Sequence, residues 1–140
     1  MNEGSISHEL RVRYNECDAQ GIVFNANWFV YFDAAMTEFW RETIGGYQHV
    51  PTAYSIEVVV AETGARFRGA ARFDDVVNIV PKLRRVGTSS MRVEFDALRG
   101  DDLLVEGFIE CVFVDANAMQ PTPIPDGIRN MLPTADLLGG

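Results

Sequence analysis

The stretch Arg13–Glu42, RYNECDAQGIVFNANWFVYFDAAMTEFWRE, brings an aspartate, Asp18, directly in front of a long apolar helix. The pattern predicts a strand that ends near Glu16, a tight turn over residues 19–21, and a helix that opens around residues 26–27. These three parts place a carboxylate beside the N-terminus of a helix. Such a pair is the start of an active site.

The start of a helix offers backbone N–H groups without partners and a partial positive charge, which suit an oxygen that gains negative charge during a reaction. Asn25 or Asn27 is expected to cap the helix, and Gly21 lets the backbone turn sharply or approach a ligand closely. A carboxylate beside such donors supplies a nucleophile or base together with a stabiliser of the oxyanion, the two parts that acyl transfer needs. The alternative is that Asp18 only caps the turn closed by Gly21.

Length and composition predict one compact domain. The chain has 140 residues, of which 47% are apolar, so it can bury a core and is not expected to be disordered. Its net charge of −8 argues against binding to nucleic acid or to anionic membranes. The sequence shows neither a signal-peptide pattern nor an apolar run long enough to cross a bilayer, so we expect a cytoplasmic protein without membrane insertion.

The two cysteines and two histidines do not form a recognisable motif. Cys17 and Cys111 lack a CxxC partner, so neither a disulfide framework nor a metal site is predicted. Cys17 could act as a nucleophile only with a base beside it, and neither His8 nor His49 is placed to help, so a packing role is favoured. The sequence contains no GxSxG motif, and nothing signals a Ser-His-Asp triad.

Apolar periodicity predicts the elements on either side of the Asp18 turn. Alternation over Ile6–Tyr14 indicates a half-buried strand. Apolar residues then recur at three- and four-residue steps, which predicts a largely enclosed helix over Trp28–Ile44. The stripe consists of Trp28, Phe29, Phe32, Ala35, Met36, Phe39, Trp40 and Ile44.

After this helix the period changes to two. Strands are predicted over Ile56–Phe67, Val76–Val86, Ser90–Leu98 and Leu103–Val114, the last two joined as a hairpin. Pro81 places the second of these strands at a sheet edge or at a bulge.

The tail is predicted as an extended, proline-rich segment followed by a short helix over Asp126–Leu132, with residues 1–5 and 133–140 loose. One strand, one helix and four further strands make an α+β domain in which a strongly curved antiparallel sheet wraps a single helix. Its exposed edges make a dimer a reasonable expectation.

Two runs carry a resemblance to a known family: Tyr14–Trp28, YNECDAQGIVFNANW, with the pattern D-x-x-G-x-V, and Phe32–Ala35, FDAA. They resemble the signature of the 4-hydroxybenzoyl-CoA thioesterase family of hotdog-fold proteins, which includes the YbgC-type acyl-CoA thioesterases. Phe67, the turn Arg72–Asp75 and the step Gly87–Ser90 also fall where that family has similar residues. The resemblance implies a five-stranded hotdog fold, a dimer or tetramer, and hydrolysis of acyl-CoA to a free acid and CoA without metal or organic cofactor.

The resemblance also implies roles for individual residues. Asp18 falls on the family's catalytic carboxylate, which attacks the thioester carbonyl or activates a water. Asn25 falls where the backbone N–H at the helix start polarises that carbonyl, a position at which YbgC-type members often carry histidine. Asp33 falls where aromatic-acyl members have an aspartate that can reach a ring hydroxyl; the alternative is a solvated helix face.

Substrate contacts are expected in two further places. Val23, Phe24, Val58 and Phe67 are predicted to line the acyl chamber between subunits, beside Gly21. Arg84 and Arg85 are candidates for the CoA phosphates, with the turn residues Thr88, Ser89 and Ser90 bonding the pantetheine arm. Solvated strand residues are the alternative for the two arginines.

Other functional classes fit less well. A noncatalytic dimeric hotdog module that binds acyl-CoA or acyl carrier protein would keep Asp18 only as a turn residue. A hotdog hydratase would need a histidine on the approach to the helix, and no histidine lies between His8 and His49. A cone-shaped domain of the cystatin-like class does not match the order of elements with Asp18 at the helix start.

Overall fold

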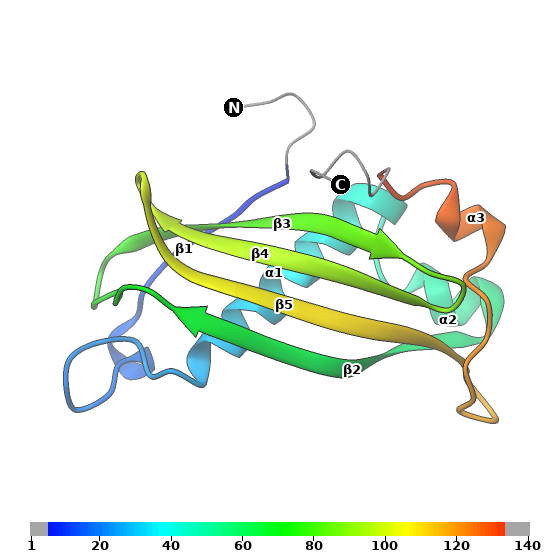
Figure 1. Cartoon of the computed structure of the whole chain (residues 1–140), viewed down its shortest axis with the longest axis horizontal. Helices are drawn as coiled ribbons and strands as arrows, with labels where there is room; N and C mark the ends of the chain where they lie inside the picture. Colours follow the sequence, from blue (N-terminus) through cyan, green and yellow to red (C-terminus); the bar gives the residue numbers. More distant parts are fainter. Residues whose placement is uncertain (1–5, 134–140) are drawn as a thin grey trace.

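The computed structural model describes residues 6–133, so residues 1–5 and 134–140, most of the predicted loose ends, lie outside the described residues. Figure 1 shows α1 behind a sheet that curves around it. The elements in chain order are β1 (His8–Arg11), the 3-10 helix η1 (Tyr14–Glu16), α1 (Asn27–Ile44), α2 (His49–Tyr54), β2 (Ile56–Phe67), β3 (Val76–Val86), β4 (Ser90–Arg99), β5 (Asp102–Asp115) and α3 (Asp126–Arg129).

The five strands form one antiparallel sheet in the order β1-β3-β4-β5-β2. β3, β4 and β5 are joined as successive hairpins. β1 covers only Val76–Ile79 of β3, whereas β2 pairs with β5 from Ile56 to Phe67. The predicted α+β class, with a curved five-stranded sheet around one long helix, is confirmed.

The apolar face of α1 fills the concave side of the sheet. Phe32 stacks on Phe95 of β4 with ring centroids 5.3 Å apart, and both rings are fully buried. The helix stops at Gly45, whose φ of 84° allows the N–H groups of residues 45 and 46 to bond carbonyls of the last turn. The buried helix residues are Trp28, Tyr31, Phe32, Ala35, Met36, Phe39, Trp40 and Ile44. Tyr31 therefore replaces the predicted Phe29, which stays 36% exposed.

β1 is shorter than predicted because the chain leaves the sheet after Arg11. Val12 instead exchanges hydrogen bonds with the loop before β3: its N–H donates to the Asp75 oxygen, and its oxygen accepts from the Asp74 N–H, both at 2.9 Å. The turn η1 then follows. The short β1 leaves Pro81 beyond the ladder with β1, which confirms that its part of β3 is an edge.

Two local features differ from the sequence prediction. α2 occupies a segment for which the sequence predicted neither a helix nor a strand, and it is held by Val50, which is fully buried. α3 ends at Arg129, three residues earlier than predicted. Neither difference moves the Asp18 loop.

β2 presents an unusual edge. It is 12 residues long, with a register shift between Val60 and Glu62, and its outer side is unpaired by any strand within residues 6–133. Val60 is 58% exposed and Phe67 49% exposed. A long apolar edge of this kind favours pairing with another chain.

Candidate active site

A small hydrogen-bonded hairpin holds Asp18. The Asp18 N–H donates to the Ile22 oxygen at 2.8 Å, and the Gly21 N–H donates to the Asp18 oxygen at 2.9 Å. Gly21 closes this turn with a φ of 81°, which favours glycine. Cys17 and Val23 form a bridge behind the turn. The half-buried aspartate is therefore fixed at the tip of a rigid loop.

Among residues 6–133, only one carboxylate oxygen of Asp18 has a hydrogen-bond partner. Its Oδ1 accepts the Gln20 N–H at 2.8 Å, which forms an Asx turn. This bond is the turn-capping role that the sequence predicts as the alternative for Asp18. Its Oδ2 accepts no hydrogen bond from residues 6–133 and can face a substrate or a water. Capping the turn and acting on a ligand are thus compatible.

The start of α1 has no side-chain cap. The predicted capping by Asn25 or Asn27 is wrong, because the N-cap residue is Ala26 and the Asn27 side chain points elsewhere. The N–H groups of Asn25 and Ala26 donate to no acceptor within the described part of the chain. Two donors at the positive end of an 18-residue helix are therefore open to a ligand oxygen.

Glu16 ties the Asp18 loop to α1. Its backbone oxygen accepts the Phe24 N–H at 2.9 Å and the Asn27 Nδ2 at 3.1 Å. Its carboxylate accepts the Arg13 N–H and the Tyr31 hydroxyl, each at 2.8 Å. Burial, and then the neighbouring Glu16 carboxylate, raise the pKa of Tyr31, so this phenol remains a donor. No sequence pattern indicated this network, which fixes the loop against the helix.

The loop between β2 and β3 supports the other side of the Asp18 hairpin. The Val23 N–H donates to the Ala71 oxygen at 2.9 Å, and Ile22 bridges to Arg72, whose guanidinium lies beside Gly21. Asp75 closes the loop by accepting the Arg72 N–H. That bond, together with Arg99, holds the pKa of Asp75 below its usual value.

Two cavities have lining residues from both α1 and β2. The smaller, about 230 Å³, lies at the helix start and is lined by Ile22, Val23, Asn25, Trp28, Phe67, Gly69 and Ala70. The larger, about 510 Å³, is lined by Asp33, Met36, Thr37, Trp40, Tyr47, Gln48, Val58, Val60, Ile109 and Cys111. The predicted wall residues are thus divided between the two, and Phe24, 52% exposed, lines neither of them.

A comparison with protein families decides where this arrangement belongs. The family model of the thioesterase-like superfamily matches residues 12–132. The chain belongs to this superfamily.

Individual thioesterase relatives cover nearly the whole chain. The acyl-CoA thioesterase YbgC of Haemophilus influenzae is 24% identical over 129 residues, 92% of this chain and 95% of that protein. The acyl-CoA thioester hydrolase YbgC of Escherichia coli O6:H1 is 28% identical over 129 residues, 91% of this chain and 96% of that protein. These similarities confirm the resemblance to YbgC-type thioesterases.

A solved structure confirms the hotdog fold of this superfamily member. A hypothetical protein from Thermus thermophilus superposes with a TM-score of 0.84 at 28% identity, covering 94% of this chain and 98% of that chain. None of the helices within residues 6–133 has the length and hydrophobicity needed to cross a bilayer.

In this thioesterase-like chain, the predicted CoA residues lie far from Asp18. The Asp18 hairpin adjoins the loop before β3, whereas residues 87–90 follow the end of β3, 11 residues later. Such a strand spans about 36 Å, so within one protomer the Asp18 hairpin and the turn of residues 87–90 lie at opposite ends of the sheet (Figure 1). Only another subunit could bring them together.

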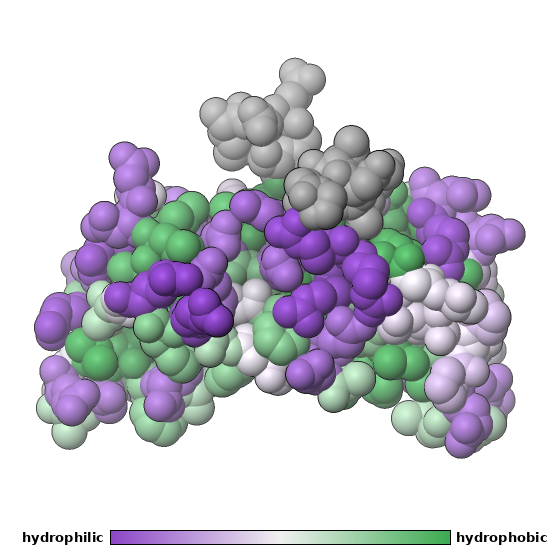
Figure 2. Space-filling view, viewed as in Figure 1, coloured by the Kyte–Doolittle hydropathy of each residue, from purple (hydrophilic) through white to green (hydrophobic). Residues whose placement is uncertain are grey.

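Both arginines predicted to bind the CoA phosphates pair with carboxylates on the outer face of the sheet. Arg84 Nε lies 3.0 Å from Glu94, and Arg85 pairs with Glu110 and donates to the Ser90 hydroxyl at 3.2 Å. Figure 2 shows hydrophilic residues gathered over this face. Burial opposes the charge on Glu94, but bonds from Arg84 and Arg92 outweigh it and hold the pKa of Glu94 below its usual value.

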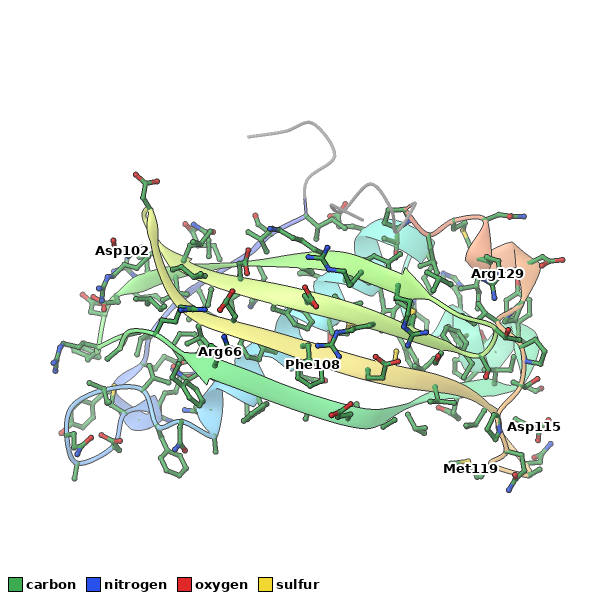
Figure 3. The ribbon with its side chains drawn as sticks, in the orientation of Figure 1. Arg66, Asp102, Phe108, Asp115, Met119 and Arg129 are labelled. Atoms are coloured by element: carbon green, nitrogen blue, oxygen red, sulfur yellow. The ribbon has the colours of Figure 1, made fainter. Side chains whose placement is uncertain are left out.

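α3 braces the turn between β3 and β4. Arg129 Nη2 donates to the oxygens of Gly87 and Thr88 at 2.8 and 3.1 Å, and the Ile124 N–H donates to the Thr88 oxygen at 2.9 Å. Figure 3 shows Arg129 on α3 beside this turn. Arg129 is therefore a cation at the predicted pantetheine turn that sequence periodicity did not identify.

The cysteines occupy packing positions. The Cys17 Sγ lies 3.8 Å from the Arg13 oxygen, and Cys111 is buried on β5. Burial raises the pKa of Cys111 to about 12, so its thiol stays protonated near neutral pH. These surroundings favour the packing role predicted from the sequence.

Proposed function

We propose that the protein is an acyl-CoA thioesterase that hydrolyses its substrate to a free acid and CoA. The observation that carries the proposal is the hydrogen-bonded loop that joins Asp18 to the start of α1. One Asp18 carboxylate oxygen lacks a partner among residues 6–133, and the N–H groups of Asn25 and Ala26 at the uncapped helix start are also free of partners there. Membership of the thioesterase-like superfamily and the similarity to relatives named acyl-CoA thioesterases support it. A cytoplasmic location stays a prediction.

In the proposed reaction, the thioester oxygen accepts hydrogen bonds from the N–H groups of Asn25 and Ala26. These donors stabilise the charge that develops on the oxygen when the carbonyl is attacked. Asp18 either removes a proton from an attacking water or attacks the carbonyl itself. The C–S bond then breaks, and CoA leaves as its thiolate, which takes up a proton. If Asp18 attacks, water hydrolyses the resulting anhydride and regenerates the carboxylate.

The chemistry requires only these protein groups and a water, so the proposal includes no metal or organic cofactor. The smaller cavity would hold the thioester end of the acyl group, with Val23 and Phe67 as its walls. Gly21 would leave room for the substrate to approach the loop. Asp33 stands at the larger cavity, where its carboxylate could accept a hydrogen bond from a hydroxyl on the acyl group.

The proposed active form is a homodimer in which two β2 strands pair antiparallel. Two-fold pairing would bury the exposed apolar side chains Val60 and Phe67 and would continue the sheet across the interface. It would also place the first residues of one β2 beside the last residues of the other.

This arrangement would bring the CoA turn to Asp18. The turn of residues 87–90 lies at the Ile56 end of β2, because Ser90 pairs with Val112 and Val112 with Val59. In the dimer the partner's turn therefore comes toward the Asp18 end of this protomer. Its Thr88, Ser89 and Ser90, with Arg84 and Arg85, would contact the pantetheine arm and phosphates. Pairing of two such dimers would give a tetramer.

The test is thiol release from a panel of short, medium, long and aromatic acyl-CoAs by the purified wild-type protein. Catalytic turnover of at least one member is expected. Binding of acyl-CoA without hydrolysis of any panel member, either as CoA thioesters or on acyl carrier protein, would contradict the proposal. That result would favour the noncatalytic module.

A further inference from the structure

We infer that a groove between α1 and β2 carries the acyl chain from the 230 Å³ cavity at the helix start into the 510 Å³ cavity, and that the substrates are neutral hydrocarbon acyl groups of medium length. This inference rests on the proposed thioesterase function. According to this inference, the larger cavity determines which lengths of acyl chain the protein accepts.

Both cavities have lining residues on α1. Asn25 lines the smaller cavity, and Asp33, Met36 and Trp40 line the larger one. Phe29, partly exposed, lies in the first turn of α1, four residues before Asp33 and seven before Met36, so these three positions share one side of the helix. A chain that starts at the helix N-terminus can follow this side without crossing the core.

β2 forms the opposite wall of the groove. Its final residue, Phe67, lines the smaller cavity, and Val58 and Val60 line the larger one. The register shift after Val60 keeps Thr63, Ala65 and Phe67 opposite the inward-facing β5 residues, so the inner side of β2 is continuous. The groove is therefore bounded by the same two elements at both ends.

The lining of the larger cavity favours a hydrocarbon. The Tyr47 hydroxyl is fully used, because it donates to Glu57 at 2.9 Å and accepts the Val58 N–H at 3.0 Å. The Cys111 thiol is buried and weakly polar. The single charged group is Asp33, which would repel an acyl chain that ends in a carboxylate. Neutral chains are thus selected.

The geometry sets an approximate chain length. From Asn27 to Met36 the helix advances nine residues, or about 14 Å. An extended covalent chain advances about 1.2 Å per bond, since three bonds span one extended residue. A chain of roughly ten to twelve carbons therefore reaches the larger cavity, whereas a four-carbon chain stays near the helix start.

The first test blocks the larger cavity from its exposed side. Thr37 lines that cavity and is exposed, and its hydroxyl bonds only the Asp33 backbone oxygen among the residues that the structure describes, so Thr37→Trp should fold. Thr52→Trp on α2 is the matched control, because Thr52 is also exposed, makes the same kind of bond to the Gln48 oxygen and lies outside both cavities. We expect Thr37→Trp to lower kcat/KM for dodecanoyl-CoA at least tenfold while butyryl-CoA changes less than twofold. Thr52→Trp should change neither.

An equal loss for both chain lengths, or no loss for either, would overturn the assignment of the cavity. Either result would leave the proposed function intact as long as the wild type hydrolyses acyl-CoA. The absence of hydrolysis by the wild type would refute the proposed function instead.

A second measurement does not depend on the folding of Thr37→Trp. Trp28 lines the smaller cavity and Trp40 the larger one, and the chain has no other tryptophan. In Asp18→Asn protein, variants Trp28→Phe and Trp40→Phe each leave one fluorescent reporter. Dodecanoyl-CoA is expected to change the emission of both reporters, whereas butyryl-CoA changes only that of Trp28. Equal responses of Trp40 to the two ligands would contradict the inference.

Discussion

Removing the Tyr31 hydroxyl should weaken both the fold and the support of the Asp18 loop. The hydroxyl donates to the Glu16 carboxylate at 2.8 Å, and Tyr31 is only 5% exposed. Tyr31→Phe keeps the ring and leaves no large cavity, so the hydrogen bond is the main loss. A bond to a charged group contributes about 1.5–3 kcal/mol, against 0.5–1.5 for a neutral pair. The upper range applies here because the acceptor is the carboxylate of a half-buried glutamate, Glu16.

The assay is urea denaturation at pH 7, with a double-mutant cycle to Glu16→Ala. Alanine removes the acceptor of the Tyr31 hydroxyl, and the accompanying loss of the Arg13 bond is common to both Glu16→Ala proteins and cancels, so the cycle isolates the bond to Tyr31. We expect Tyr31→Phe to lower the free energy of unfolding by about 2 kcal/mol, and the cycle to give a coupling energy of at least ~1 kcal/mol. Additive effects, with a coupling below about 0.4 kcal/mol, would refute the role of this bond.

Three further predictions concern the sheet and its edge. Gly107→Ala should destabilise the protein by about 3 kcal/mol or more, because its Cβ would collide with the buried ring of Phe32; a thermal midpoint within 2 °C of wild type would contradict this. Asp75→Asn should cost about 1–3 kcal/mol at pH 7. Since folding lowers the pKa of Asp75, this stabilisation is present above the unfolded value near 3.9 and is lost as the pH falls through the folded value. The gap in urea denaturation between wild type and variant should therefore close in acid, and a gap that persists below the folded pKa would refute the assignment. Val60→Asp should convert the proposed dimer to monomers in light scattering, and an unchanged mass would exclude β2 as the interface.

The sheet could be predicted from the sequence because its residues alternate with little interruption. β2 and β3 begin and end where the period-two pattern predicted, and the β4–β5 hairpin is longer than predicted by one residue at the end of β4 and at both ends of β5. α2 could not be predicted in this way, since six residues give too little periodicity and its stability comes from the burial of Val50. The end of β1 could not be predicted either. Val12 is apolar and continues the alternating pattern, but its backbone bonds a loop that is distant in sequence.

The candidate site, too, could be predicted from the sequence only in part. The local pattern around Asp18 and Gly21 predicted the turn and the helix start. The pattern could not indicate that Ala26 would be the N-cap residue or that Tyr31 would reach Glu16, because both depend on how the loop docks on the helix. The distance between the Asp18 hairpin and the turn of residues 87–90 follows from strand length and sheet order, which only the assembled fold reveals.

The most direct measurement of the central claim is kcat/KM for thiol release by Asp18→Asn, using the acyl-CoA that the wild type hydrolyses best. Asp74→Asn is the matched control, because it removes the same charge from an exposed aspartate. Asp74 pairs with Arg11, and the two side chains are each 62% exposed. Asparagine can keep the turn but cannot act as base or nucleophile, so a fall of about a hundredfold or more is predicted, with Asp74→Asn within about twofold of wild type. Folded Asp18→Asn protein that retains more than about a tenth of the wild-type kcat/KM would contradict the account.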